Sequence, residues 1–104
     1  MIEPEALAQA LEADVPLRVL DVRNPPEFEI VRFEGAMELP LGELAGRLHT
    51  LEPDYRYVLV CHSGGRAAQA YQLLKSGGFE DVAVLAGGID AWAERVQTDL
   101  ARYR

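Results

Sequence analysis

Short apolar runs alternate with amphipathic segments along the chain, and this alternation limits the folds it can adopt. Four runs have the length and composition of buried strands, at residues 17–22, 36–39, 57–60 and 82–85. Helical spacing of apolar residues marks the segments 4–12, 26–29, 42–48, 66–75 and a last one that begins at about residue 89. Strands that alternate with helices usually form parallel sheets. The sequence therefore predicts an α/β fold with a mostly parallel central sheet flanked by helices on both faces.

The last predicted helix carries an apolar side that continues toward the end of the chain. Its members recur at intervals of three or four residues and are Ile89, Trp92, Val96, Leu100 and Tyr103. Trp92 at this spacing is interpreted as a core residue. The tail from Val96 to Arg104 is expected to pack on the domain or on a partner.

Composition narrows the class of protein. A chain of 104 residues with 49% hydrophobic content is expected to form one domain over residues 1–104. A formal charge of −7 without a basic patch argues against a nucleic-acid partner. No leader and no membrane-length apolar run is evident, so a cytoplasmic protein without a membrane partner is expected. One cysteine and two histidines without ligand spacing argue against a metal site.

The single cysteine, Cys61, stands between the apolar run 57–60 and a Gly-rich turn that opens the next helix. Isolated cysteines are often small buried hydrophobes. A turn of this kind, however, aims several backbone N–H groups at one point, and helix N-termini and such nests favour anions. The sequence therefore predicts a nucleophilic thiolate in an anion cradle, whose amides come from His62, Ser63, Gly64, Gly65 and Arg66.

The size of this loop bears on the substrate. Four residues separate Cys61 from Arg66, whereas phosphatases with a Cys-loop-Arg site place five there, around a tetrahedral phosphate. The tighter cradle suits a single atom added to the thiolate, such as a sulfane sulfur, better than a phosphoryl group.

Several ordered motifs together resemble a single-domain rhodanese over nearly the whole chain. They are Leu20-Asp21-Val22-Arg23, Pro26-Glu27-Phe28, Gly35-Ala36, Leu39-Pro40-Leu41, the loop from Cys61 to Arg66, Gly78-Phe79, Val82 and Leu85-Ala86-Gly87-Gly88-Ile89-Asp90-Ala91-Trp92. The resemblance implies a sulfurtransferase that needs no cofactor. Cys61 would take a sulfane sulfur from a small donor such as thiosulfate, carry it as a persulfide, and pass it to cyanide, a thiol or a sulfur-relay protein.

Two segments depart from the family pattern. Residues 31–34 are Val-Arg-Phe-Glu where the family usually has Gly-His-Ile-Pro, and the loop begins with His62 and Ser63 where thiosulfate-specific members often have basic residues. The sequence therefore leaves two alternatives, that thiosulfate is the donor itself or only a surrogate for it. His62 is expected either to face solvent or to present partial positive charge to an anionic donor.

The remaining site residues are charged. Arg66 lies in the first helical turn, where a cation is slightly unfavourable, so it is interpreted as a clamp on a carboxylate of Asp21 or Glu27. The resemblance implies that Asp21 orients the loop rather than acting as a general base. Arg23 is expected either in a solvated turn or at the pocket mouth, and is counted with Asp21 and Glu27 among the residues expected to support the loop.

Two other functions remain alternatives. One is a binding or regulatory module that keeps the fold without turnover, although such a module has no need of Cys61 and its Gly-rich loop. The other is a phosphatase or arsenate reductase on the same architecture, which the short loop disfavours.

Overall fold

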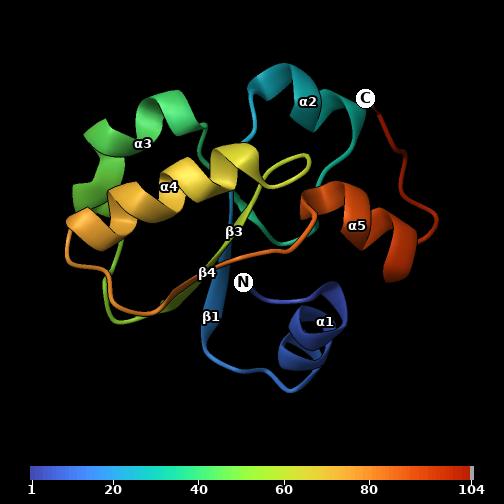
Figure 1. The fold of residues 1–104 in the computed structure, drawn as a ribbon, viewed down its shortest axis with the longest axis horizontal. Helices are drawn as coiled ribbons and strands as arrows, with labels where there is room; N and C mark the ends of the chain where they lie inside the picture. Colours follow the sequence, from blue (N-terminus) through green and yellow to red (C-terminus); the bar gives the residue numbers. More distant parts are fainter. Residues whose placement is uncertain (104) are drawn as a thin grey trace.

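The sheet has four strands, all parallel, in the order β2-β1-β3-β4. The computed structural model describes residues 1–103, and its strands are β1 (Leu17–Asp21), β2 (Met37–Glu38), β3 (Arg56–Val60) and β4 (Val82–Val84). Figure 1 shows β1, β3 and β4 in the middle of the molecule, with helices around them. The predicted α/β fold with a parallel sheet is confirmed.

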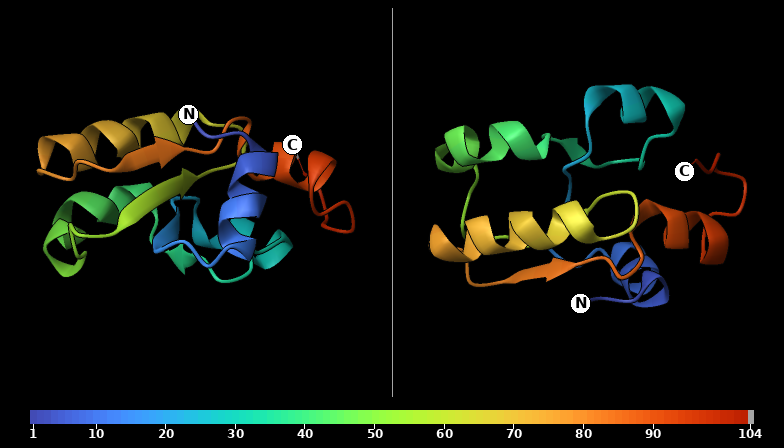
Figure 2. Two further views of the ribbon diagram at one scale, coloured as in Figure 1. Left: turned by 90° about the horizontal axis from the view of Figure 1, so that it is seen from below. Right: turned by 45° about the horizontal axis from the view of Figure 1, so that its top comes forward.

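The helices are α1 (Pro4–Glu12), α2 (Pro25–Ile30), α3 (Leu41–Arg47), α4 (Gly65–Ser76) and α5 (Gly88–Arg95), with a 3₁₀ turn, η1 (Leu48–Thr50). Neighbouring side chains of a strand point to opposite faces. Leu59 of β3 accordingly packs in a cluster with residues of α3 and α4, whereas Val58 packs in a second cluster with residues of α1 and α5. Figure 2 shows α1 beside α5 in both views, and α4 running alongside β4. The two clusters confirm that helices cover both faces of the sheet.

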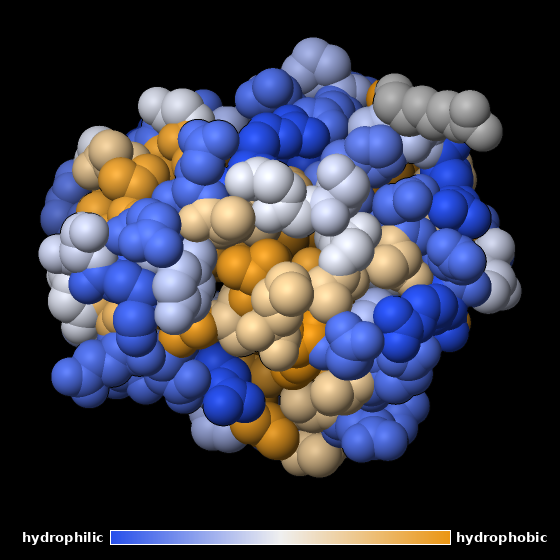
Figure 3. Space-filling view, in the orientation of Figure 1, coloured by the Kyte–Doolittle hydropathy of each residue, from blue (hydrophilic) through white to orange (hydrophobic). Residues whose placement is uncertain are grey.

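An apolar area remains exposed on one face of the molecule. In the orientation of Figure 1, Figure 3 shows apolar side chains gathered in the middle of the face and bordered by hydrophilic ones. A hollow of about 230 Å³ beside β4 is lined by Met1, Tyr71 and Val84, among others. Ile2 pairs with Leu85 in a parallel bridge, so the N-terminal segment covers part of this edge of the sheet.

The last helix is shorter than the apolar spacing predicts. It ends at Arg95, because the amides of Val96 and Gln97 both bond to the carbonyl oxygen of Trp92 at 2.9 Å and the chain then turns away. The Gln97 side chain also accepts a hydrogen bond from the Trp92 indole at 3.1 Å. Trp92 is buried, as expected.

The tail after α5 folds back on the domain. Val96, Leu100 and Tyr103 all pack against the cluster between the sheet and α1 and α5. The prediction that these residues lie on one helix is therefore wrong, because the chain reaches the same face by reversing direction. Arg104, the last residue of the predicted tail, lies outside the described residues.

Candidate active site

The site lies at the carboxyl edge of the sheet, where two strands end side by side. Asp21 is the last residue of β1, and Cys61 follows directly after β3. Asp21 pairs in register with Val60, and the Val22 amide bonds to the Val60 carbonyl oxygen at 2.9 Å. Parallel α/β folds bind their ligands at this edge.

Cys61 lies under the loop that follows it, with only 1% of its surface exposed. Its Sγ accepts hydrogen bonds from the backbone amides of Gly64, at 2.9 Å, and Ala67, at 3.4 Å. Gly64 has φ +122°, a conformation that residues with a Cβ rarely adopt. The cysteine is thus buried, which is common for an unreactive thiol. Its sulfur nevertheless accepts hydrogen bonds from two backbone amides, and such donors favour an anionic sulfur.

The two donors only partly match the expected set. Of the five predicted amides, that of Gly64 bonds to the sulfur, whereas those of His62, Ser63, Gly65 and Arg66 make no such bond within residues 1–103. The additional donor is Ala67, the third residue of α4. The first N–H groups of a helix have no partner inside the helix, so counting from the start of α4 would have indicated it.

The start of the loop is fixed by the N-terminus of α5. The amide of Ile89 donates to the Cys61 carbonyl oxygen at 2.8 Å, and the amide of Asp90 donates to the His62 carbonyl oxygen at 3.1 Å. A Cβ on Gly88 would collide with both carbonyl oxygens. The second glycine of the Gly87-Gly88 pair is therefore what lets α5 approach the loop this closely.

The end of the loop is held by Glu27. Both terminal nitrogens of Arg66 bond to the Glu27 carboxylate, with Nη2 2.7 Å from Oε2. Asn24 also donates its backbone N–H to Glu27 Oε1 at 3.0 Å, which fixes the carboxylate at the start of α2. Hydrogen bonding to Arg66 lowers the pKa of Glu27 to about 2 against the effect of partial burial. Glu27, rather than Asp21, is thus the partner of Arg66.

Asp21 and Arg23 form a separate, fully buried ion pair. Arg23 Nη2 lies 2.8 Å from both Asp21 Oδ2 and the carbonyl oxygen of Val31, and Nη1 lies 3.3 Å from the carbonyl oxygen of Glu27. Both expectations for Arg23, a solvated turn and a position at the pocket mouth, are wrong. The guanidinium can be buried because the Asp21 carboxylate and the carbonyl oxygens of Glu27 and Val31 accept hydrogen bonds from its N–H groups.

Tyr103 completes the site from the tail. Its ring stacks on that of His62, with centroids 4.1 Å apart and planes 14° from parallel, so His62 is half-buried rather than directed into solvent. The Tyr103 hydroxyl donates to Glu27 Oε2 at 2.6 Å and accepts from Arg23 Nη1 at 3.1 Å. Burial is the main reason that the pKa of Tyr103 is raised. Sequence reasoning missed this role because no local signal connects Tyr103 with residues some eighty positions earlier.

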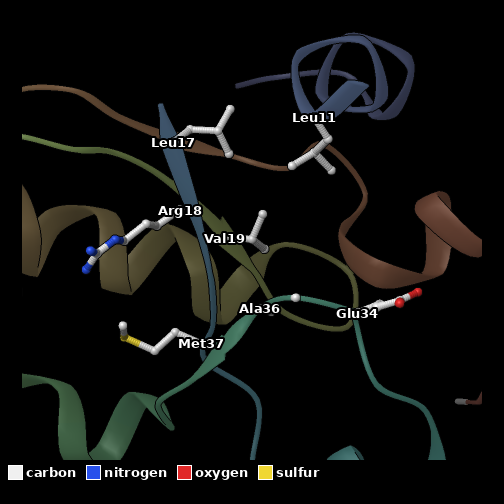
Figure 4. A pocket seen from close by; sticks show the side chains of 8 residues that line it. Leu11, Leu17, Arg18, Val19, Glu34, Ala36 and Met37 are labelled. Atoms are coloured by element: carbon white, nitrogen blue, oxygen red, sulfur yellow. The ribbon is translucent and has the colours of Figure 1, made fainter. Parts of the chain in front are cut away.

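Besides the hollow next to β4, two others lie on the surface of residues 1–103, and only one of them adjoins the Cys61 loop. His62 and Tyr103, with Asp90 and Arg102, line an open pocket of about 620 Å³ beside the loop. Figure 4 shows the other hollow, of about 320 Å³, between α1 and the strands β1 and β2. Its lining shares no residue with the Cys61 site and includes no Cys, Ser, Thr, Lys or His side chain.

Two features are absent from residues 1–103. Among these residues, no group of three His, Cys, Asp or Glu side chains is placed to hold a metal ion. Over the same part of the chain, no helix has the length and apolar character needed to span a membrane.

This fold and site define a protein of the rhodanese type. The chain belongs to the rhodanese-like domain family, whose sequence model matches residues 3–95. It is 38% identical to the probable adenylyltransferase/sulfurtransferase MoeZ of Mycobacterium tuberculosis, over 98% of this chain and 26% of MoeZ. It is 34% identical to the putative sulfurtransferase YtwF of Bacillus subtilis, over 88% of this chain and 87% of YtwF.

A solved structure agrees with this assignment. The rhodanese-related protein of Thermoplasma volcanium superposes with a TM-score of 0.83 at 29% identity, over 91% of each chain. The chain thus spans 87% of YtwF and 91% of the Thermoplasma volcanium protein, but only 26% of the length of MoeZ. The predicted resemblance to the rhodanese family is confirmed.

Proposed function

We propose that this protein transfers sulfane sulfur through a persulfide on Cys61. The observation that carries the proposal is the pair of amides, from Gly64 and Ala67, that donate to a sulfur inside a loop of only four intervening residues. Donors of this kind favour an anionic sulfur. Relatives such as YtwF carry the name sulfurtransferase, which supports the same chemistry.

The reaction divides into two displacements at sulfur. In the first, the Cys61 thiolate attacks the outer sulfur of a donor such as thiosulfate; a new S–S bond forms, the donor's S–S bond breaks, and sulfite leaves with the electron pair. In the second, cyanide or a thiolate attacks the outer sulfur of the persulfide, and Cys61 leaves as the thiolate. Each step exchanges one bond to sulfur for another, so the chemistry of transfer needs no outside oxidant or cofactor.

The chain's own residues supply electrostatic support and positioning. Gly64 and Ala67 donate to the thiolate before the attack and to the leaving thiolate after transfer. The amides of Gly65 and Arg66 lie in the first turn of α4, where a helix leaves N–H groups unpaired, and we assign them to the outer sulfur. The ion pair between Glu27 and Arg66 keeps the end of the loop in place.

The acceptor is proposed at the level of class. Small thiols and cyanide fit the chemistry, and a carrier protein is a further candidate because the name of MoeZ combines adenylyltransferase with sulfurtransferase. A reducing compartment such as the cytoplasm is part of the proposal, since a lone thiol nucleophile stays reduced there.

Intact-mass measurement after incubation with thiosulfate tests the proposal. The wild type should gain the mass of one sulfur atom, and that mass should be lost on addition of cyanide as thiocyanate appears. Cys61→Ala should gain nothing. The combination of Cys61→Ala with Ser76→Cys moves the thiol to the exposed C-terminal end of α4, the helix that follows the Cys61 loop, and should gain little, because the two amides are no longer beside it.

Two outcomes would contradict the proposal. One is the absence of a sulfur adduct on the wild type with thiosulfate, polysulfide or a persulfide donor. The other is equal uptake by the relocated thiol, which would make the loop irrelevant. Rapid hydrolysis of a small aryl phosphate would favour the phosphatase alternative instead.

A further inference from the structure

The tail residue Tyr103 contacts both ends of the loop that holds Cys61. At the start of the loop, its ring stacks on His62 at 4.1 Å. At the end of the loop, its hydroxyl donates to the same Glu27 oxygen, Oε2, that Arg66 Nη2 binds at 2.7 Å. Tyr103 therefore joins the two ends of the loop, which α5 and Glu27 otherwise hold separately.

The position of Tyr103 is fixed by contacts on α5 and in the core. Arg102 binds the Asp90 carboxylate through Nε at 2.9 Å and Nη2 at 3.1 Å, and Leu100 packs against the cluster beneath α5. The Tyr103 hydroxyl also accepts a hydrogen bond from Arg23, which is fully buried and held by its ion pair with Asp21. The tyrosine is therefore held in place from both sides.

We propose that Tyr103 is a positioning residue for sulfur transfer, acting on the Cys61 loop through Glu27 and His62. The inference rests on the proposed function, and it concerns a segment beyond residues 3–95, which the family match covers. Within residues 1–103, Tyr103 makes no hydrogen bond to the sulfur or to the amides that bind it, so its effect passes through the Glu27–Arg66 pair and the stacked histidine. Small displacements of a positioned nucleophile are costly, because reaction rates depend steeply on geometry.

A double-mutant cycle between Tyr103 and Glu27 tests this route. Tyr103→Phe keeps the stacked ring and removes the hydroxyl, and we expect kcat/KM for transfer from thiosulfate to cyanide to fall about 3- to 10-fold. In a Glu27→Gln background the same change should cost less than about twofold, because the carboxylate through which Tyr103 acts is already gone. Tyr71→Phe, in α4 and away from the loop, is the matched control and should leave the rate unchanged in both backgrounds.

A second variant separates the stacking contact from the hydroxyl. Tyr103→Leu removes both, so its rate should fall below that of Tyr103→Phe, by about 100-fold relative to wild type. Melting temperatures identify any variant that is simply unfolded. Tyr103→Phe keeps the packing of the ring and serves if Tyr103→Leu does not fold.

The same double-mutant cycle can be measured without sulfur transfer, by following the rate at which iodoacetamide alkylates Cys61. We expect Tyr103→Phe to change the alkylation rate at least threefold in the wild-type background and much less in the Glu27→Gln background. Wild-type rates for Tyr103→Phe in both assays would overturn the proposal, as would effects that simply multiply in the double variant. If the wild type transfers no sulfur, the proposed function fails, and the alkylation cycle still decides the role of Tyr103.

Discussion

The Glu27 carboxylate lets the strength of the loop's support be measured by pH. Its pKa is lowered from 4.5 to about 2, chiefly by its hydrogen bonds to Arg66. That difference corresponds to about 3 kcal/mol of folding free energy. The Glu27 side chain is only 16% exposed, so solvent screens the pair little, although Arg66 is 30% exposed. We therefore expect Glu27→Gln to lower the free energy of unfolding by about 2–3 kcal/mol at pH 7.

The sign of the pH dependence follows from the lowered pKa. The unfolded chain binds a proton at Glu27 near pH 4.5, whereas the folded chain binds it only near pH 2. The stabilisation is thus complete above about pH 4.5 and is lost as the pH falls toward 2. The difference between wild type and Glu27→Gln should shrink over this range.

Urea unfolding at pH 7, 4 and 2.5 measures this difference. Glu29→Gln is the matched control, because Glu29 lies on the same helix with 81% of its side chain exposed and its only ion pair is to Arg32 at 3.6 Å, within residues 1–103. That control should change the free energy of unfolding by less than about 0.5 kcal/mol, and its effect should not vary with pH as much as that of Glu27→Gln. A penalty for Glu27→Gln that is below about 0.5 kcal/mol at pH 7, or that stays constant down to pH 2.5, would refute the reasoning.

Two further changes probe the backbone of the loop and the buried pair. Gly64→Ala, at φ +122°, should cost about 1–3 kcal/mol and at least about tenfold in sulfur transfer, whereas Gly46→Ala in α3, where a Cβ meets nothing within 4 Å, should stabilise by about 0.5–1 kcal/mol. Similar melting temperatures and rates for the two would contradict this account. Arg23→Met should cost about 3–5 kcal/mol in urea unfolding because it leaves the buried Asp21 unpaired. Exposed Arg32→Met should cost less than about 0.5 kcal/mol, and equal losses would show that burial does not set the penalty.

Elements whose signals are local could be predicted closely from the sequence. The first helix was expected over residues 4–12 and occupies Pro4–Glu12, because a proline suited to its first turn precedes one apolar stripe. The apolar spacing does not predict the end of α5, where the amides of Val96 and Gln97 both bond to the Trp92 carbonyl oxygen and the Gln97 side chain accepts from the Trp92 indole. Periodicity indicated which face the tail's apolar residues would occupy, but not the backbone conformation that brings them there.

The candidate site shows the same division between local and distant signals. Cys61 and Gly64 lie within one short segment, so their approach could be predicted from the turn they share. The sequence does not decide whether Asp21 or Glu27 binds Arg66, because both carboxylates are expected near the carboxyl edge of the sheet. The structure gives a physical reason for the outcome: Arg23 occupies the Asp21 carboxylate in the interior, and only Glu27 remains for Arg66.

The burial of Cys61 also bears on how sulfur would leave the protein. At 1% exposure the thiol itself offers almost no surface to an acceptor. In a persulfide, the outer sulfur lies about 2 Å beyond Sγ, so it is the transferred atom, rather than Cys61, that an acceptor would meet. Such an arrangement limits the access of reagents to the thiolate, whereas the transferred sulfur remains within reach. Under the proposed function, iodoacetamide should therefore react faster with the sulfur-loaded protein than with the unloaded one, and equal rates would show that burial gives no such protection.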